Sequence, residues 1–393
     1  MKFSKGVQSS STAIKKSGLE VSLSHSYFLR RFTIGNALVS LGMFVCATGG
    51  SWDISNHLLN KPETFFSAPH AVLYTGVAVA IFGAVIVRMA SSSIFNNNLN
   101  RHAKLTFTGI SMMTIAAPLD FAWHSAFGLD GLLSPPHLVL LLGMIMSSLG
   151  AMLGIISYIN SAKVPTVIQD NDDVPGKDST RLEGRRLNST MLLLIIIGVL
   201  PVWMTLDGLI GMCSLPFSNT EYFNFNLDPF TAAVVATIGY PVLISFILCS
   251  SSSLANRKFG ILSAIGASYL IVHAISTIIP NESLIPTLPF YMLNILAFLA
   301  SDILVSFSSN KIYSILAGAI LGSSFFMIQY PLITYIYSEV FSNQSFVWPS
   351  LISSTYFRMI SNIYPLILGP CFAMGIIGGI LARKITSELT GKQ

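Results

Sequence analysis

The sequence predicts an all-α protein, a polytopic transmembrane helical bundle of about ten spans built as tandem helical hairpins. Of the 393 residues 52% are hydrophobic, and only 10% are Asp, Glu, Lys or Arg, against about 25% in soluble domains. The mean hydropathy is +0.67, and apolar runs recur at the length of about 20 residues that crosses a bilayer. Because so few charges cannot cover a water-exposed surface, the composition excludes soluble, disordered and nucleic-acid-binding proteins.

Polar segments divide the apolar runs into two halves. Residues 1–32 form a basic tail, and four spans follow within 33–159. Residues 160–188 have mixed charge, two prolines and no apolar periodicity, as expected of a cytoplasmic linker. Six spans occupy 189–382, and a short cytoplasmic tail, 383–393, ends the chain. The spans are expected near 33–51, 69–89, 104–125, 136–159, 189–213, 229–250, 259–279, 286–307, 311–337 and 361–382.

Lysine and arginine residues predict the orientation, because they are enriched in cytoplasmic loops. With ten spans both termini lie on one side. That side then holds twenty of the 22 basic residues, and only Lys61 and Arg358 lie on the other. We therefore expect both termini to be cytoplasmic and the chain to be a multi-pass protein of the plasma membrane.

The front half contains a repeat with an interval of 67 residues. Its shared pattern is D-x3-H-x5-[DE]-x3-S-x-P-H-x-V-L-x2-G, without a gap, which indicates an internal duplication. The first copy comprises Asp53, His57, Glu63, Ser67, Pro69, His70, Val72, Leu73 and Gly76. The second comprises Asp120, His124, Asp130, Ser134, Pro136, His137, Val139, Leu140 and Gly143.

The repeat places the polar residues of each hairpin at the non-cytoplasmic membrane edge. In each copy an Asp and a His stand at i and i+4, so that one helix face carries both. The proline suits the first turn of the next helix, where a missing N–H is tolerated, and a second His follows it directly. A fainter version of the pattern is found in the back half, around Asp207 and His273.

Ionisable residues at membrane depth predict a functional site, and this set favours a metal centre. Imidazole and carboxylate ligands suit a divalent ion such as zinc, iron or manganese, or copper where histidines dominate. Haem is less favoured because carboxylates stand beside the histidines. The predicted metal ligands are His57, His70, His124 and His137, with Asp53 and Asp120 as ligands or as partners that orient the rings. Glu63 and Asp130 are predicted as general bases or gating ligands.

Three functions are compatible with this pattern. A metal with an open position would allow oxidation, hydroxylation or hydrolysis of a small or lipid-soluble substrate that arrives from the non-cytoplasmic side. Asp and His pairs could instead serve an ion- or proton-coupled transporter or channel. They could also fix the hairpin geometry of a non-catalytic structural subunit. The sequence leaves open whether the hairpins share one site and in what oligomeric state the protein works; the lipid bilayer is its expected partner.

Overall fold

The computed structural model describes most of the chain, and most of the described residues are helical. It covers 6–58, 64, 66–91, 97–127, 133–163, 187–214, 227, 229–278, 282–324, 328 and 364–390. No strand occurs in these residues. The front helices are α1 (Gly6–Leu58), α2 (Ala68–Ser91), α3 (Asn97–Phe127) and α4 (Pro135–Lys163). The back helices are α5 (Ser189–Ser214), α6 (Pro229–Leu254), α7 (Ile261–His273), η1 (Ala274–Ile278), η2 (Glu282–Thr287), α8 (Leu288–Met292), α9 (Asn294–Phe307), a helix over 311–324, and α12 (Tyr364–Thr390).

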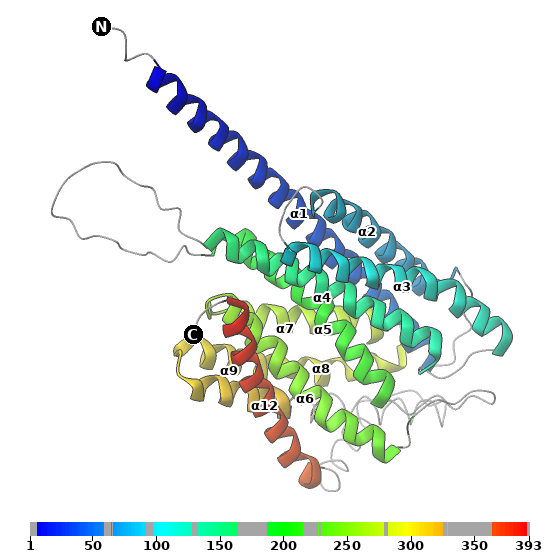
Figure 1. Ribbon diagram of the computed structural model, residues 1–393. Helices are drawn as coiled ribbons and strands as arrows, with labels where there is room; N and C mark the ends of the chain where they lie inside the picture. Colours follow the sequence, from blue (N-terminus) through cyan, green and yellow to red (C-terminus); the bar gives the residue numbers. More distant parts are fainter. Residues whose placement is uncertain are drawn as a thin grey trace.

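Eight helices of the described chain are long and apolar enough to cross a membrane, which confirms the all-α, membrane-type fold. The predicted seventh span is shorter than those eight, since its apolar helix is Ile261–Ser276, and the π-helical turn η1 begins at Ala274. The predicted ninth span is helical over 311–324 and then continues outside the described residues. The count of ten therefore stays a prediction. α1 begins at Gly6, so residues assigned to the basic tail continue the first span as one projecting helix (Figure 1).

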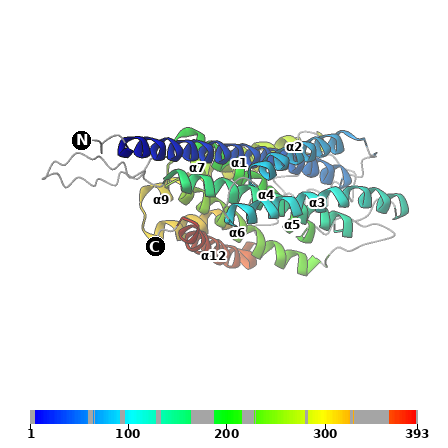
Figure 2. The ribbon, with the colours of Figure 1, turned by 45° about the horizontal axis from the view of Figure 1, so that its top comes forward.

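The front half is a pair of antiparallel hairpins that lie side by side. α1 packs mainly against α2, and α3 mainly against α4. α1 and α4 contact each other, and both also contact α5, so both hairpins pack against the back half. Figures 1 and 2 show the four front helices side by side, with α6 and α12 below them.

Glycines bring the two helices of each hairpin into close contact. A Cβ atom on Gly42 would lie 2.6 Å from the carbonyl oxygen of Gly76. A Cβ atom on Gly109 would lie 2.5 Å from the carbonyl oxygen of Gly143. The second pair follows the first by 67 residues in the sequence, so both hairpins pack in the same register. Small residues permit such close approach between membrane helices.

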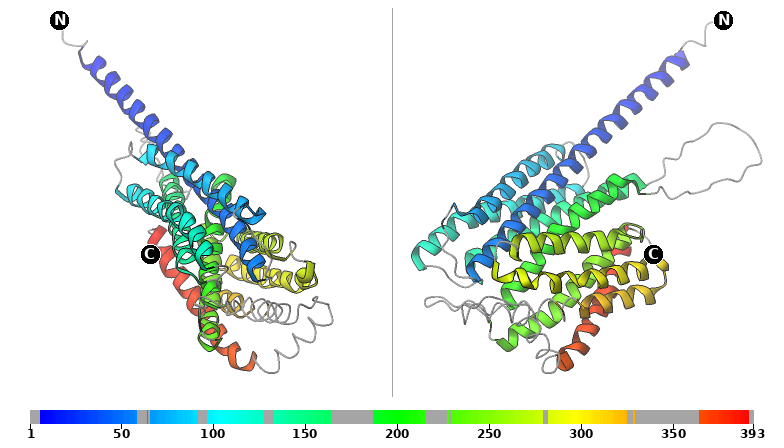
Figure 3. Two further views of the ribbon diagram at one scale, coloured as in Figure 1. Left: turned by 90° about the vertical axis from the view of Figure 1, so that its right-hand side faces the viewer. Right: turned by 180° about the vertical axis from the view of Figure 1, so that it is seen from behind.

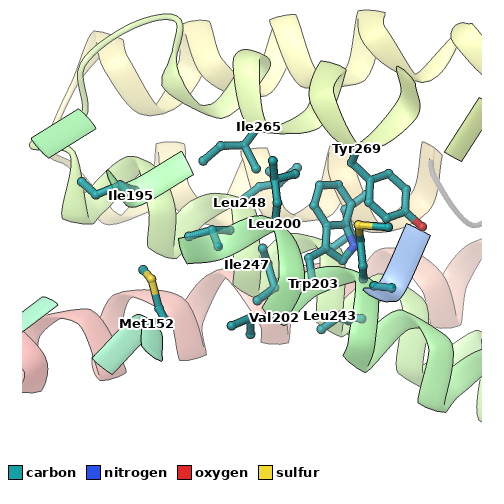
Figure 4. Close-up of a cluster of buried hydrophobic side chains, with 14 of the residues drawn as sticks. Met152, Ile195, Leu200, Val202, Trp203, Leu243, Ile247, Leu248, Ile265 and Tyr269 are labelled. Carbon is teal, nitrogen blue, oxygen red and sulfur yellow. The ribbon is translucent and has the colours of Figure 1, made fainter. Parts of the chain in front are cut away.

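The back half packs against the front half through one continuous hydrophobic core, which reaches from α1 and α4 to α9. At its centre the Trp203 indole stacks on the Tyr269 ring, with ring centroids 3.9 Å apart (Figure 4). The 311–324 helix lies against α12, where a Cβ atom on Gly318 would be 2.5 Å from the carbonyl oxygen of Gly375. Viewed from behind, α7 and α9 lie beside α5 on the side away from α3 (Figure 3).

Candidate metal centre

The second hairpin brings three potential ligands together where α3 ends and α4 begins. Asp120 and His124 project from one face of α3 because they are one helical turn apart. α4 begins at Pro135, so Pro136 lies in its first turn as predicted and His137 follows at the third position. The ligand atoms of Asp120, His124 and His137 all lie within 4.8 Å of one another.

The distances in this group suit ligands of one ion. The Asp120 Oδ1 atom is 3.2 Å from His137 Nε2 and 3.6 Å from His124 Nε2. Ligands at about 2.1 Å from a metal lie roughly 3.0 Å apart in octahedral and 3.4 Å apart in tetrahedral geometry. The imidazole rings of His124 and His137 are tilted by 51° with centroids 5.3 Å apart, so they do not stack face to face. The three side chains could therefore supply three ligands to one ion.

The chemistry of the group points to a divalent cation. One carboxylate and two neutral imidazoles carry a single negative charge, which a divalent ion converts into a net positive one. Between 16% and 23% of each of the three side chains is exposed, so the group is accessible without being fully solvated. Two histidines and one carboxylate leave coordination positions open, as in catalytic zinc sites and non-haem iron sites.

The first hairpin forms a related but different arrangement. The His70 Nε2 atom lies 2.9 Å from Asp53 Oδ1, and its Nδ1 atom lies 2.8 Å from the Thr64 carbonyl oxygen. Since a carbonyl can only accept, Nδ1–H is the donor and Nε2 faces the carboxylate. A neutral ring would then direct a lone pair at a negative charge, so the pair requires a proton or a metal ion between its two atoms. Histidines that bind metals often donate their other N–H to a backbone carbonyl.

The structure therefore groups part of the predicted site. It brings Asp120, His124 and His137 together, and it pairs Asp53 with His70. The side chain of His57, and Glu63 and Asp130 as whole residues, lie outside the described part of the chain.

A small cavity joins the two hairpins to the back half. Asp53 of α1 and His137 of α4 both line it, although they belong to different hairpins. α5 supplies the opposite wall with Met204, Thr205 and Gly208. These α5 residues were not predicted, because no pattern in an apolar span distinguishes a cavity wall from ordinary helix packing.

The two polar residues noted in the back half have aromatic partners. The Tyr269 hydroxyl donates to Asp207 Oδ2 over 2.9 Å, and the Tyr291 hydroxyl lies 2.7 Å from His273 Nδ1. Asp207 and His273 thus hydrogen-bond tyrosines within the back half. Tyrosines were not among the predicted partners, since their apolar rings suit any buried span.

Comparisons with other proteins do not assign this chain to a class of protein, so the class follows from the geometry alone. The sequence matches no protein-family model, and searches of curated proteins and of solved structures found no match. The fold and the site define a helical protein of the membrane type that carries a His/Asp group able to hold a metal ion.

Proposed function

We propose that this chain is an integral membrane metalloprotein that acts on a small or lipid-soluble molecule at the non-cytoplasmic membrane edge. The observation that carries the proposal is the convergence of Asp120, His124 and His137 within 4.8 Å. An ion held by these three residues would keep open positions for water or substrate, where it supplies Lewis-acid chemistry or oxidation. Metal-dependent oxidation, hydroxylation or hydrolysis is the reaction type that follows.

The location of the site in the membrane rests on the distribution of charge. Basic residues of the described chain lie near or beyond the ends of the apolar spans away from the site, and they include Arg30, Arg31, Arg88, Arg101, Lys104, Lys163, Arg257, Lys258, Lys311, Arg383 and Lys384. Because basic residues favour the cytoplasmic side, this distribution supports cytoplasmic termini and a site that faces outward. The plasma membrane is the proposed location, and the substrate would arrive from outside or from the bilayer.

Two further acidic residues are proposed to serve the reaction. Glu63 and Asp130 occupy the same position of the 67-residue repeat, in the loop between the two helices of each hairpin. A carboxylate in that loop would be close enough to the ligands to accept a proton as a general base or to close the site. The identical register of the glycine contacts in both hairpins supports the duplication from which this assignment follows.

The experiment is metal analysis of the purified protein and of three single variants. His124→Ala and His137→Ala should each lose the stoichiometric metal of the wild type, since each removes one of three ligands. His102→Ala is the matched control, because His102 is a half-buried histidine of the same helix near its other end. It should keep the wild-type metal content, with all three variants remaining folded by circular dichroism.

Other results would contradict the proposal. A wild type without stoichiometric metal after incubation with zinc, iron, manganese or copper would exclude a metalloprotein. Ion flux in liposomes that depends on Asp120, without bound metal, would indicate a transporter instead. Loss of thermal stability in His124→Ala and His137→Ala, with neither metal nor flux affected, would indicate a structural role.

A further inference from the structure

The cavity between the two hairpins and α5 is partly open, and its wall consists largely of apolar side chains. Its volume is about 100 Å³. Its polar wall groups include Asp53, which pairs with His70, and His137, which pairs with Asp120. The apolar lining includes Ile54, Leu73, Leu141, Met144, Met204 and Met212.

The wall formed by α5 is less polar than its sequence suggests, because its threonine hydroxyl is already hydrogen-bonded. Thr205 lines the cavity, but its hydroxyl donates to the Pro201 carbonyl over 2.8 Å and is thereby satisfied within its own helix. Its methyl group is then the part that remains for a ligand. Asp53 and His137 already face His70 and Asp120, and the rest of the wall offers a charged molecule little in exchange for its hydration, which makes binding unfavourable.

The volume of the cavity suits a small molecule. An apolar protein cavity of about 150 Å³ stays dry and binds benzene or xenon. A cavity of about 100 Å³ therefore takes a molecule somewhat smaller than benzene, or a single xenon atom. Methionines form three positions of the lining, and their flexible, polarisable side chains adapt to ligands of different shape.

We infer that this cavity is the substrate chamber of the proposed metal centre and that it binds a small, uncharged, largely apolar molecule beside His137 and Asp53. The inference rests on the proposed function, because His137 is both a ligand of the metal group and part of the chamber wall. Beyond the proposed function, the inference specifies the class of substrate, a small and uncharged apolar molecule. Both hairpins and α5 contribute residues to the chamber wall, so a ligand in the chamber contacts all three.

Two glycines of the chamber wall allow the space to be filled. A Cβ atom on Gly50 would meet no other atom within 4 Å, and one on Gly208 would lie 3.6 Å from Leu141 Cδ1, an ordinary contact. Gly50→Leu and Gly208→Leu therefore introduce a leucine without a backbone clash, and each side chain enters the chamber. Gly369→Leu is the matched control, since Gly369 lies exposed on α12 and its Cβ would also meet nothing within 4 Å.

Xenon is the probe, and crystals of the full chain pressurised with xenon locate it by anomalous scattering. The wild type and Gly369→Leu should show one xenon peak in the chamber, between Leu141 and Met204. Gly208→Leu and Gly50→Leu should each lower the xenon occupancy by about tenfold or more, because the added side chain takes the space the atom needs. Metal content, measured on the same preparations, should stay at the wild-type level in all of these variants.

The outcomes separate the chamber from the metal centre. No xenon peak in the wild-type chamber, or a peak that both leucine variants retain, overturns the inference even if metal is bound. A lost peak with retained metal supports it. A wild type that binds xenon in the chamber but no metal refutes the proposed function and, with it, the assignment of the chamber to a metal centre.

Discussion

The two front hairpins carry the same pattern of residues but lie in different surroundings. Of the most apolar 18-residue stretch of α1, 61% is buried, whereas only 28% is buried in the corresponding stretch of α3. α1 lies between α2, α4 and α5, while α3 contacts mainly α4. Asp53 consequently faces a cavity that is lined by residues of α1, α2, α4 and α5. Asp120, in contrast, lies between two histidines near the protein surface.

This difference shows how one motif can take two roles. In the second hairpin one carboxylate oxygen lies near two imidazole nitrogens, which is the minimum of a metal site with open positions. In the first hairpin the described carboxylate has a single described imidazole partner, and that ring is held by the Thr64 carbonyl. We therefore assign metal binding to the second hairpin and a wall of the substrate chamber to the first.

The largest expected effect is on metal affinity, and it should differ between variants of the two aspartates. Asp120→Asn should weaken metal binding by about 100-fold or more, since loss of groups that merely support ligands already costs 10–100-fold. Asp53→Asn should weaken it by less than about tenfold, because Asp53 lies outside the three-ligand group. Competition titration with a chelator measures both constants.

Equal losses of metal affinity in the two variants would contradict the difference between the hairpins. Such a result would mean that each hairpin holds its own ion, with His57 completing the first site. A stoichiometry of two metal ions per chain in the wild type would lead to the same conclusion.

The next effect concerns the helix contacts, in which the hairpins are expected to behave alike. Gly42→Ala and Gly109→Ala should each lower the free energy of unfolding by about 1–3 kcal/mol, the usual cost of overpacking. The added Cβ would meet the backbone of Gly76 in one case and of Gly143 in the other. Gly50→Ala is the control, since its Cβ meets nothing.

Unfolding in detergent, followed by circular dichroism, measures these three variants. A large loss in Gly42→Ala with none in Gly109→Ala would contradict the shared register. A comparable loss in Gly50→Ala would show that close contact does not determine the result, since alanine is the better helix former and has room at that position.

The smallest expected effect is on the free energy of unfolding and concerns the His70 ring of the first hairpin. His70→Phe keeps the ring but removes the hydrogen bond to the Thr64 carbonyl and the contact with Asp53. The free energy of unfolding should fall by about 1–2 kcal/mol, because the Asp53 carboxylate loses a partner in a partly buried position. Metal content should remain that of the wild type, and a loss of metal would place His70 among the ligands.

Much of this arrangement follows from sequence, for physical reasons that differ from residue to residue. Asp120 and His124 could be placed on one face because a helix repeats every 3.6 residues, and His137 could be placed at a helix start because Pro136 precedes it. Both predictions are confirmed by the grouping of the three ligand atoms. The apolar lengths likewise predicted the spanning helices.

Other features depend on tertiary packing that no local pattern contains. The burial of α1 and the exposure of α3 depend on which helix of each hairpin packs against α5, which is α1 in the first hairpin and α4 in the second. Similar sequences in α1 and α3 give no hint of this difference. The chamber wall of Met204, Thr205 and Gly208 consists of residues common in any apolar span. The partner of His70 is a backbone carbonyl, and backbone groups have no signature in a sequence.

Anomalous scattering at the absorption edge of the bound metal tests the central claim most directly. Crystals of the metal-loaded protein should show a peak within coordination distance of Asp120 Oδ1, His124 Nε2 and His137 Nε2. The peak should be absent in His137→Ala and present in His102→Ala. A peak between Asp53 and His70 alone, or none in protein that folds normally, would contradict the assignment of the metal centre to the second hairpin.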